Sequence, residues 1–297
     1  MPIPRESYEE LHGRFAEALG WMQVIGVQIT SGRTEKYLDT LADWTKKHKE
    51  ATDQEAKEAF VPFVSAINEV QDFLRVFDAF RSKEPDALSS IAERLQQAVN
   101  GPSYLFNENP RTSRPRNFLF EAAVAAKVHK PERGIEAMLH PPTDAAFNFK
   151  NYRFLIECKR VSRLETVGQN IRRATNQLER ALRERLGSGL RGLVAIDISK
   201  VFTSGNEIFA RSNENELRGS LDQLMDRFIN ENCRVWETIY QRRSRKILGA
   251  IFRYSFVSSS ESDELLITTD QWALNPALRC TEAERNTLRQ IAGMLVQ

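Results

Sequence analysis

Residues 141–160 read PPTDAAFNFKNYRFLIECKR and contain two short apolar runs separated by Lys150-Asn151. Apolar runs of this length, rich in aromatic and branched residues and divided by a turn dipeptide, are typical of a β-hairpin. We therefore predict strands over residues 145–149 and 152–161. The second strand is apolar on both faces, which is typical of a strand in the middle of a sheet.

Three charged residues accompany this apolar hairpin. Side chains alternate between the two faces of a strand, so Glu157 and Lys159 share one face, and Asp144 at the start of the preceding strand can reach them. Buried charges cost several kcal/mol unless they are paired or bind a metal. Two carboxylates suit a hard cation such as Mg²⁺, and the ammonium suits an attacking water or a phosphate. The alternative is an ion pair at the rim of a sheet, with Asp144 only capping a turn.

The rest of the second half alternates between helical and strand-like patterns. This alternation predicts a mixed α/β domain in which helices flank a central sheet. The C-terminal helix begins at a capping box, in which Thr281 is followed three residues later by Glu284. The expected helices cover residues 117–129, 166–186 and 214–230, and the expected further strands cover residues 192–198, 247–257 and 265–268.

The first hundred residues have helical periodicity and few Gly or Pro residues, which predicts a small helical bundle. A segment rich in Gly, Pro, Asn and Ser follows at residues 100–116. The charge also changes sign there. Residues 1–100 hold 12 Lys and Arg against 17 Asp and Glu, whereas residues 101–200 hold 18 against 10. We therefore predict a helical domain over residues 1–105 and an α/β domain over residues 106–297.

The hairpin and its surroundings resemble the PD-(D/E)XK, or restriction-endonuclease-like, nuclease superfamily. In that pattern an acid opens the second core strand, and an acid-x-Lys triplet lies on the third. Asp144 matches the first acid, and Glu157 and Lys159 match the triplet. Glu121 matches a glutamate on the preceding helix. The resemblance covers about residues 112–200, and Thr143 replaces the Pro of the motif's name.

The resemblance implies a Mg²⁺-dependent nuclease, in which Mn²⁺ would substitute for Mg²⁺. Asp144 and Glu157 would hold the metal, with Glu121 as a further ligand, and Lys159 would assist the attacking water. All four would be the catalytic residues, and DNA would be the substrate, with RNA not excluded. Restriction or antiviral defence is the expected setting, by analogy of fold alone. An ordinary solvent-facing role for Glu121 is nearly as well supported.

The helix expected over residues 166–186 offers a surface for nucleic acid. Its apolar stripe would face the core, and arginines dominate what is left. Arginine forks match phosphate oxygens, although a basic helix face can also be merely solvated. A second basic cluster, Arg242-Arg-Ser-Arg-Lys246, precedes a strand. The residues that we expect to contact nucleic acid are Arg172, Arg173, Gln177 and Arg180.

Composition bounds the remaining possibilities. The hydrophobic fraction of 41% and the charged fraction of 28% are typical of a globular protein, and the sequence has no run long enough to span a bilayer. Three widely spaced cysteines fit neither a disulfide framework nor a cysteine zinc site. We expect a soluble cytoplasmic protein that binds no membrane.

Two other classes of protein compete with the nuclease interpretation. One is a catalytically inactive nuclease-like module that binds nucleic acid or a protein within a larger complex. The other is a structural adaptor that acts through its acidic helical region. That region, residues 1–105, is poorly suited to DNA, so we expect it to mediate self-association or to dock a companion protein.

Overall fold

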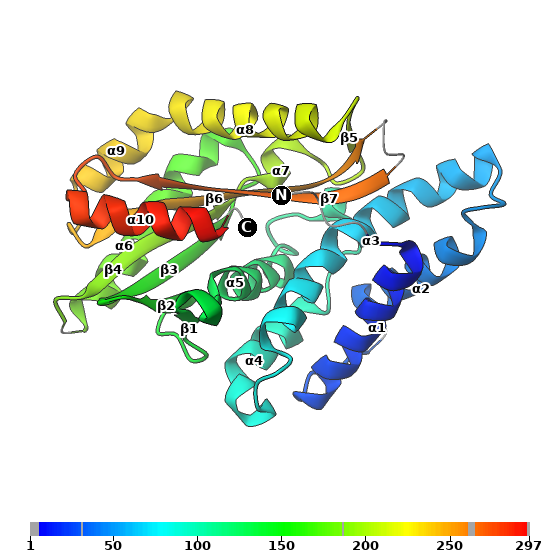
Figure 1. Cartoon of the computed structure of the whole chain (residues 1–297), viewed down its shortest axis with the longest axis horizontal. Coiled ribbons are helices and arrows are strands. Elements are labelled where there is room, and N and C mark those ends of the chain that lie inside the picture. The colour runs from blue at the N-terminus through cyan, green and yellow to red at the C-terminus, as the bar shows by residue number, and fades with distance from the viewer. Residues whose placement is uncertain (1–5, 31, 186, 261–264, 296–297) are drawn as a thin grey trace. The chain divides into compact units, whose positions relative to one another are not determined.

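The computed structural model describes residues 6–30, 32–185, 187–260 and 265–295, and it has the expected α/β fold (Figure 1). The chain forms two compact units. The first contains residues 1–123, 203–214 and 255–269, and the second contains residues 124–202, 215–254 and 270–297. No helix within the described ranges is both long and apolar enough to cross a membrane.

The first unit is mainly helical, as its periodicity predicts. Helices α1 and α3 each begin at a capping box, in which Ser7 pairs with Glu10 and Thr52 pairs with Glu55. Helices α1, α2 and α3 pack against one another around an apolar core. The helices are α1 (Tyr8–Val24), α2 (Arg33–Lys47), α3 (Asp53–Phe80), α4 (Ser89–Ala98) and α5 (Arg114–Val128), whose last residues belong to the second unit.

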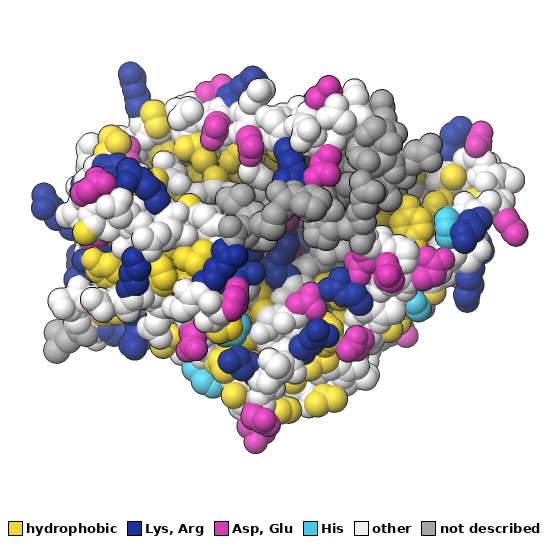
Figure 2. Space-filling model, in the orientation of Figure 1, with side chains coloured by type: hydrophobic (Ala, Val, Ile, Leu, Met, Phe, Trp, Pro, Cys, Tyr) yellow, Lys and Arg dark blue, Asp and Glu magenta, His cyan; other side chains and the backbone are white. Residues whose placement is uncertain are grey.

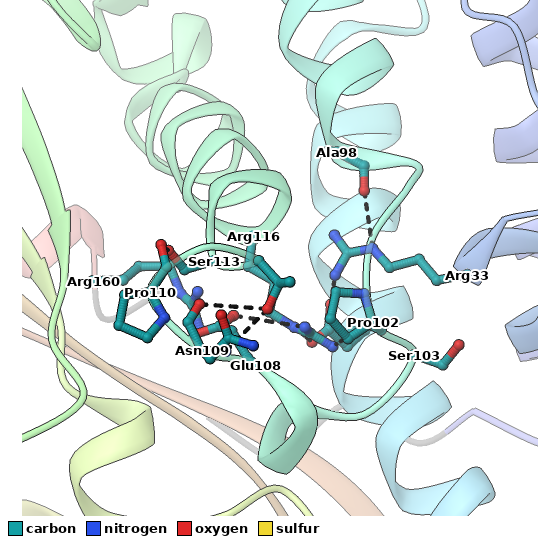
Figure 3. Close-up of polar contacts among 12 residues, drawn as sticks. Arg33, Ala98, Pro102, Ser103, Glu108, Asn109, Pro110, Ser113, Arg116 and Arg160 are labelled. Carbon is teal, nitrogen blue, oxygen red and sulfur yellow. Dashed lines mark hydrogen bonds and ion pairs between the residues drawn. The ribbon is translucent and has the colours of Figure 1, made fainter.

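The segment that reads as a linker is held to the helices of the first unit by buried ion pairs (Figure 3). Arg116 donates from Nε to Glu69 and lies 3.6 Å from Glu108, while Arg33 Nη1 lies 2.9 Å from the other Glu69 oxygen. Arg116 Nη2 also donates to the carbonyl oxygen of Pro102. These four charged side chains are each at most 10% exposed.

This network explains why the expected boundary near residue 105 differs from the division of the structure. Buried arginines and glutamates need partners, and here the partners come from α2, α3, the turn-rich segment and α5. The turns of residues 100–113 therefore belong to the first unit, and the chain passes into the second unit after residue 123. Gly, Pro and Ser mark turns in a sequence, but they do not show whether the turns are packed or free.

The second unit is built on a mixed sheet. Strands β1, β2 and β3 form an antiparallel meander, and β3, β4 and β6 run parallel to one another. The strand order is β1-β2-β3-β4-β6-β5, and β7 pairs with β6. The strands are β1 (Ile135–Ala137), β2 (Ala145–Phe149), β3 (Tyr152–Arg160), β4 (Leu190–Asp197), β5 (Ile208–Arg211), β6 (Ile247–Ser260) and β7 (Leu265–Pro276). Strand β5 and the adjoining parts of β6 and β7 belong to the first unit.

Helices cover both faces of this sheet (Figure 1). Helix α6 packs on β3 and β4, and a side chain at Gly192 would meet Leu178 and Leu182 of this helix. The parallel register places Gly192 beside Leu155, so α6 covers the face that carries Leu155, Glu157 and Lys159. The helices of the second unit are α6 (Val167–Arg183), α7 (Ser199–Phe202), α8 (Glu214–Glu231), α9 (Cys233–Gln241) and α10 (Glu282–Leu295).

Helix α10 covers the opposite face of the sheet. Arg191 points to that face because it neighbours Gly192, and its Nε donates to Glu284 of α10 at 2.8 Å. Thr281 and Glu284 form the predicted capping box at the start of this helix. The sheet therefore lies between α6 on one side and α10 on the other, and both faces of β3 and β4 are covered by helices.

Candidate active site

The hairpin of β2 and β3 brings Asp144 and Glu157 together. The two strands meet at Lys150-Asn151 as predicted, and Phe149 pairs with Tyr152. The same register pairs Ala145 with Ile156, which places Asp144 opposite Glu157 at the open end of the hairpin. The strand placement of the acid and of the acid-x-Lys triplet is therefore as the sequence predicts.

The backbone of β3 fixes the Asp144 carboxylate. Its Oδ2 accepts the backbone N–H of Cys158 at 2.7 Å, which holds the carboxylate between the two charged residues of the triplet. Cys158 points to the other face of the sheet and is buried. Its role at this site is carried by its main chain, which no pattern of side chains in the sequence could reveal.

Three oxygen atoms surround the ammonium of Lys159. Its Nζ lies 2.9 Å from the carbonyl oxygen of Cys158, 3.4 Å from Glu157 Oε2 and 3.6 Å from Asp144 Oδ2. Two of the oxygens belong to β3, the third belongs to the residue just before β2, and the three converge on one position. This arrangement forms a cradle for a cation, and the ammonium of the chain's own lysine lies in it.

Burial sets the electrostatics of the site. Glu157 is 5% exposed, and this burial, together with the nearby charge of Asp144, raises the pKa of Glu157 to about 8 against the opposing effect of Lys159. Near neutral pH the carboxyl of Glu157 therefore holds a proton for much of the time. A cation that binds both carboxyls would take the place of the proton on Glu157 and add a positive charge to that of Lys159.

The donor set fits a hard divalent cation in part. Carboxylate and carbonyl oxygens are the ligands that Mg²⁺ prefers, and Mg²⁺ commonly keeps several waters. Asp144 Oδ2, Glu157 Oε2 and the Cys158 carbonyl could supply three oxygen ligands once Lys159 moves aside. Among the described residues, no group of three or more His, Cys, Asp or Glu side chains is placed to hold a metal. The side-chain ligands would therefore be two, with the third ligand from the main chain.

Glu121, the predicted further ligand, is paired with an arginine of the first unit. It belongs to the first unit, where its Oε2 is 3.5 Å from Arg94 Nε. The contacts that join Asp144, Glu157 and Lys159 all lie within the second unit. The role of Glu121 as a further ligand stays a prediction.

Helix α6 presents its polar face to solvent as predicted. Its apolar stripe is buried, and this stripe comprises Val167, Ile171, Ala174, Leu178 and Leu182. The four side chains predicted to contact nucleic acid, Arg172, Arg173, Gln177 and Arg180, are all exposed. The helix covers the face of the sheet that carries Glu157 and Lys159, so the arginines project outward from that same side of the sheet.

A row of charged residues on the other face, of which Asp197 and Arg253 are buried, was not predicted. Arg160 and Asp197 are neighbours in register at the carboxyl ends of β3 and β4, and Asp197 pairs with Arg253 in the middle of β6. Arg160 pairs with Asp197 at 3.4 Å, and Arg253 pairs with Asp270 of β7 at 2.6 Å. The row alternates in sign, which compensates each buried charge. Its sequence signal is slight, since each member merely ends or interrupts an apolar run.

Comparisons with known proteins add nothing to this geometry. No family model matches the chain, and no curated protein or solved structure matches it. The candidate site therefore rests on its own contacts: two carboxylates, one main-chain carbonyl and one lysine, at the end of a buried hairpin.

Proposed function

We propose that this protein is a divalent-metal-dependent nuclease that hydrolyses phosphodiester bonds of DNA. The single observation that carries the proposal is the convergence of Asp144, Glu157 and the Cys158 carbonyl on the ammonium of Lys159. Support also comes from the order of elements. The acid precedes the second strand of the meander, the triplet lies on the third, and α6 follows, as in the nuclease pattern that the sequence resembles.

Each residue has a distinct task in the proposed reaction. Asp144 and Glu157 would hold the cation, and the main chain of β3 would keep Asp144 in position. A bound Mg²⁺ would supply a Lewis acid that activates water and neutralises phosphate charge. Once released from the cradle, the Lys159 ammonium would donate a hydrogen bond to the attacking water or to a phosphate oxygen. Hydrolysis then forms one bond from the water oxygen to phosphorus and breaks one ester bond, whose oxygen leaves with a proton.

The exposed arginines of α6 would bind the DNA backbone. Arg172, Arg173 and Arg180 lie on the solvent side of the helix, and guanidinium groups suit phosphate oxygens. Contacts of this kind fix the position of a duplex without reading its sequence. Gln177 lies among them and would add a neutral hydrogen-bonding group.

The proposal is tested by incubating the protein with supercoiled plasmid, linear duplex and RNA, in Mg²⁺, Mn²⁺ or EDTA. We expect DNA cutting in either metal and none in EDTA. Arg289→Gln, on the exposed side of α10, is a control variant and should cut like the wild type. Folded wild-type protein that binds DNA but cuts nothing in either metal would instead indicate an inactive binding module.

A further inference from the structure

The basic surface of the second unit extends beyond α6. Residues 167–187 and 242–246 together contain nine Lys and Arg and two Glu. Figure 2 shows Lys and Arg side chains gathered over the end of this unit where α9 leads into β6. The turn between these elements is Arg242-Arg-Ser-Arg-Lys246, in which Arg242 and Arg245 are exposed.

The turn is joined directly to the C-terminal end of α6. Glu179 of α6 lies 3.3 Å from Arg183 of the same helix and 3.3 Å from Arg243 of the turn, and it accepts the backbone N–H of Ser244. Lys246 donates to the carbonyl oxygen of Gly187 at 3.2 Å, so the turn also contacts the loop after α6. One glutamate thus connects two basic segments, and in the turn Arg242 and Arg245 remain exposed to solvent.

Along α6 the exposed positions form a single row. Residues three or four apart on a helix share a face, and the only exposed acid within residues 167–185 is Glu184, the residue that follows the last turn of the helix. This row comprises Gln169, Arg172, Arg173, Asn176, Gln177, Arg180 and Arg183, all of which are exposed. We name it, together with Arg242, Arg243, Arg245 and Lys246, the basic strip.

The basic strip has a direction. Helix α6 follows the carboxyl end of β3, where Lys159 lies, and returns to the amino end of β4. The 242–246 turn precedes β6, which is parallel to β4, so the turn lies at the amino ends of these strands. The strip therefore begins beside the candidate active site and ends at the opposite end of the sheet.

We infer that the basic strip is a one-sided footprint for duplex DNA, with the 242–246 turn as its distal anchor. This inference rests on the proposed function, because it takes the DNA to be cut near Lys159. Helix α6 has 17 residues, which at about 1.5 Å each span about 25 Å. With phosphates about 3.4 Å apart along each strand, the footprint extends about seven base pairs to one side of the cut.

The chemistry of the strip favours nucleic acid over a membrane surface. A helix that lies on a membrane needs large apolar side chains on its exposed face. The exposed row of α6 has Gln, Asn and Arg instead, and the turn adds Ser, Arg and Lys. Planar guanidinium forks separated by amides are suited to a regular array of phosphate oxygens.

The test is the salt dependence of binding of a 24-base-pair duplex in EDTA, measured by fluorescence anisotropy. The variants are Arg242→Gln/Arg245→Gln in the turn and Arg133→Gln/Arg289→Gln as the charge-matched control. All four arginines are exposed, and neither control residue lies in the strip. Each phosphate contact contributes about 0.9 to the slope of log K against log salt. We expect the turn variant to lose about 1.8 from the slope, and the control to keep the wild-type slope.

Three results would overturn the inference. One is a wild-type slope in the turn variant. Another is a control variant whose slope falls as much as that of the turn variant. The third is wild-type protein that binds vesicles of anionic lipid but not the duplex. Binding that behaves as expected, in a protein that cuts no DNA with Mg²⁺ or Mn²⁺, would support the footprint and contradict the proposed nuclease. The two proposals therefore fail separately.

Discussion

Asp144 accepts a hydrogen bond from the backbone N–H of Cys158, the residue between Glu157 and Lys159. This one contact places the acid of the second strand against the triplet of the third. Because the donor belongs to the main chain of a central strand, the carboxylate is held by the sheet itself. Asp144 lies just before β2, and its bond to the main chain of β3 fixes the position of its carboxylate in the cradle.

Divalent cations should stabilise the protein more at high pH than at low pH. The raised pKa of Glu157 means that this carboxyl holds a proton near pH 6, and a bound cation must displace it. We expect Mg²⁺ to raise the melting temperature more at pH 8.5 than at pH 6. Asp144→Asn should abolish the rise at both pH values, whereas Arg289→Gln should not. Stabilisation that does not vary with pH, or that survives in Asp144→Asn, would contradict this assignment.

Without metal, the contribution of Glu157 to the stability of the protein should fall as the pH rises. The pKa of Glu157 is about 8 in the folded state against 4.5 as its ordinary value. Its contribution is therefore complete below pH 4.5 and is lost as the pH rises through 8. The test is urea unfolding of the wild type and of Glu157→Gln in EDTA. Between pH 5 and pH 9, the unfolding free energy of Glu157→Gln should fall by about 1–3 kcal/mol less than that of the wild type. Equal pH profiles for the two proteins would exclude a raised pKa.

The buried network of the first unit should be costly to break. Arg116→Met removes a cation that lies against Glu108 and also donates to Glu69. Loss of one member of a buried ion pair costs about 3–5 kcal/mol. The exposed Arg81–Glu17 pair provides the control, since Arg81→Met should cost less than about 1 kcal/mol. Urea unfolding measures both variants, and similar small losses would mean that residues 100–113 are not held by the network.

The charge row of the sheet makes a parallel prediction. Arg253 is 3% exposed, and Asp270→Asn would remove the carboxylate that it contacts at 2.6 Å. We expect a loss of about 3–5 kcal/mol of unfolding free energy. Asp222→Asn is the matched control, because burial and the charge of Asp226 raise the pKa of Asp222. Neutralising Asp222 should therefore cost little or nothing, and a comparable loss in both variants would contradict the role of the row.

The sequence predicts the hairpin well because local signals agree there. The Lys150-Asn151 turn and the two apolar runs on either side of it indicate the same two strands, and β2 and β3 follow them closely. The short strands β1 and β5 and the short helices α7 and α9 were not predicted. Strands β1 and β5 and helix α7 have only three or four residues, too few to show a periodicity that distinguishes them from loops.

Charges were harder to predict than strands. The triplet is visible because Glu157 and Lys159 lie two residues apart on an apolar strand. Arg160, Asp197 and Arg253 become neighbours only through the parallel register of three strands. The same is true of Arg33, Glu69 and Arg116, which meet across three helices. A single sequence does not carry such long-range pairings, and the contribution of the Cys158 backbone has no side-chain signal at all.

The most direct test of the central claim is single-turnover hydrolysis of a labelled duplex with protein in excess, in Mg²⁺. Wild type, Asp144→Asn and Lys159→Ala are compared at protein concentrations that bind all of the DNA. We predict that the wild type cuts, and that each variant binds DNA but cuts at least a hundredfold more slowly. Variants that remain folded and cut at the wild-type rate would contradict the account, because hydrolysis would then not depend on the cradle.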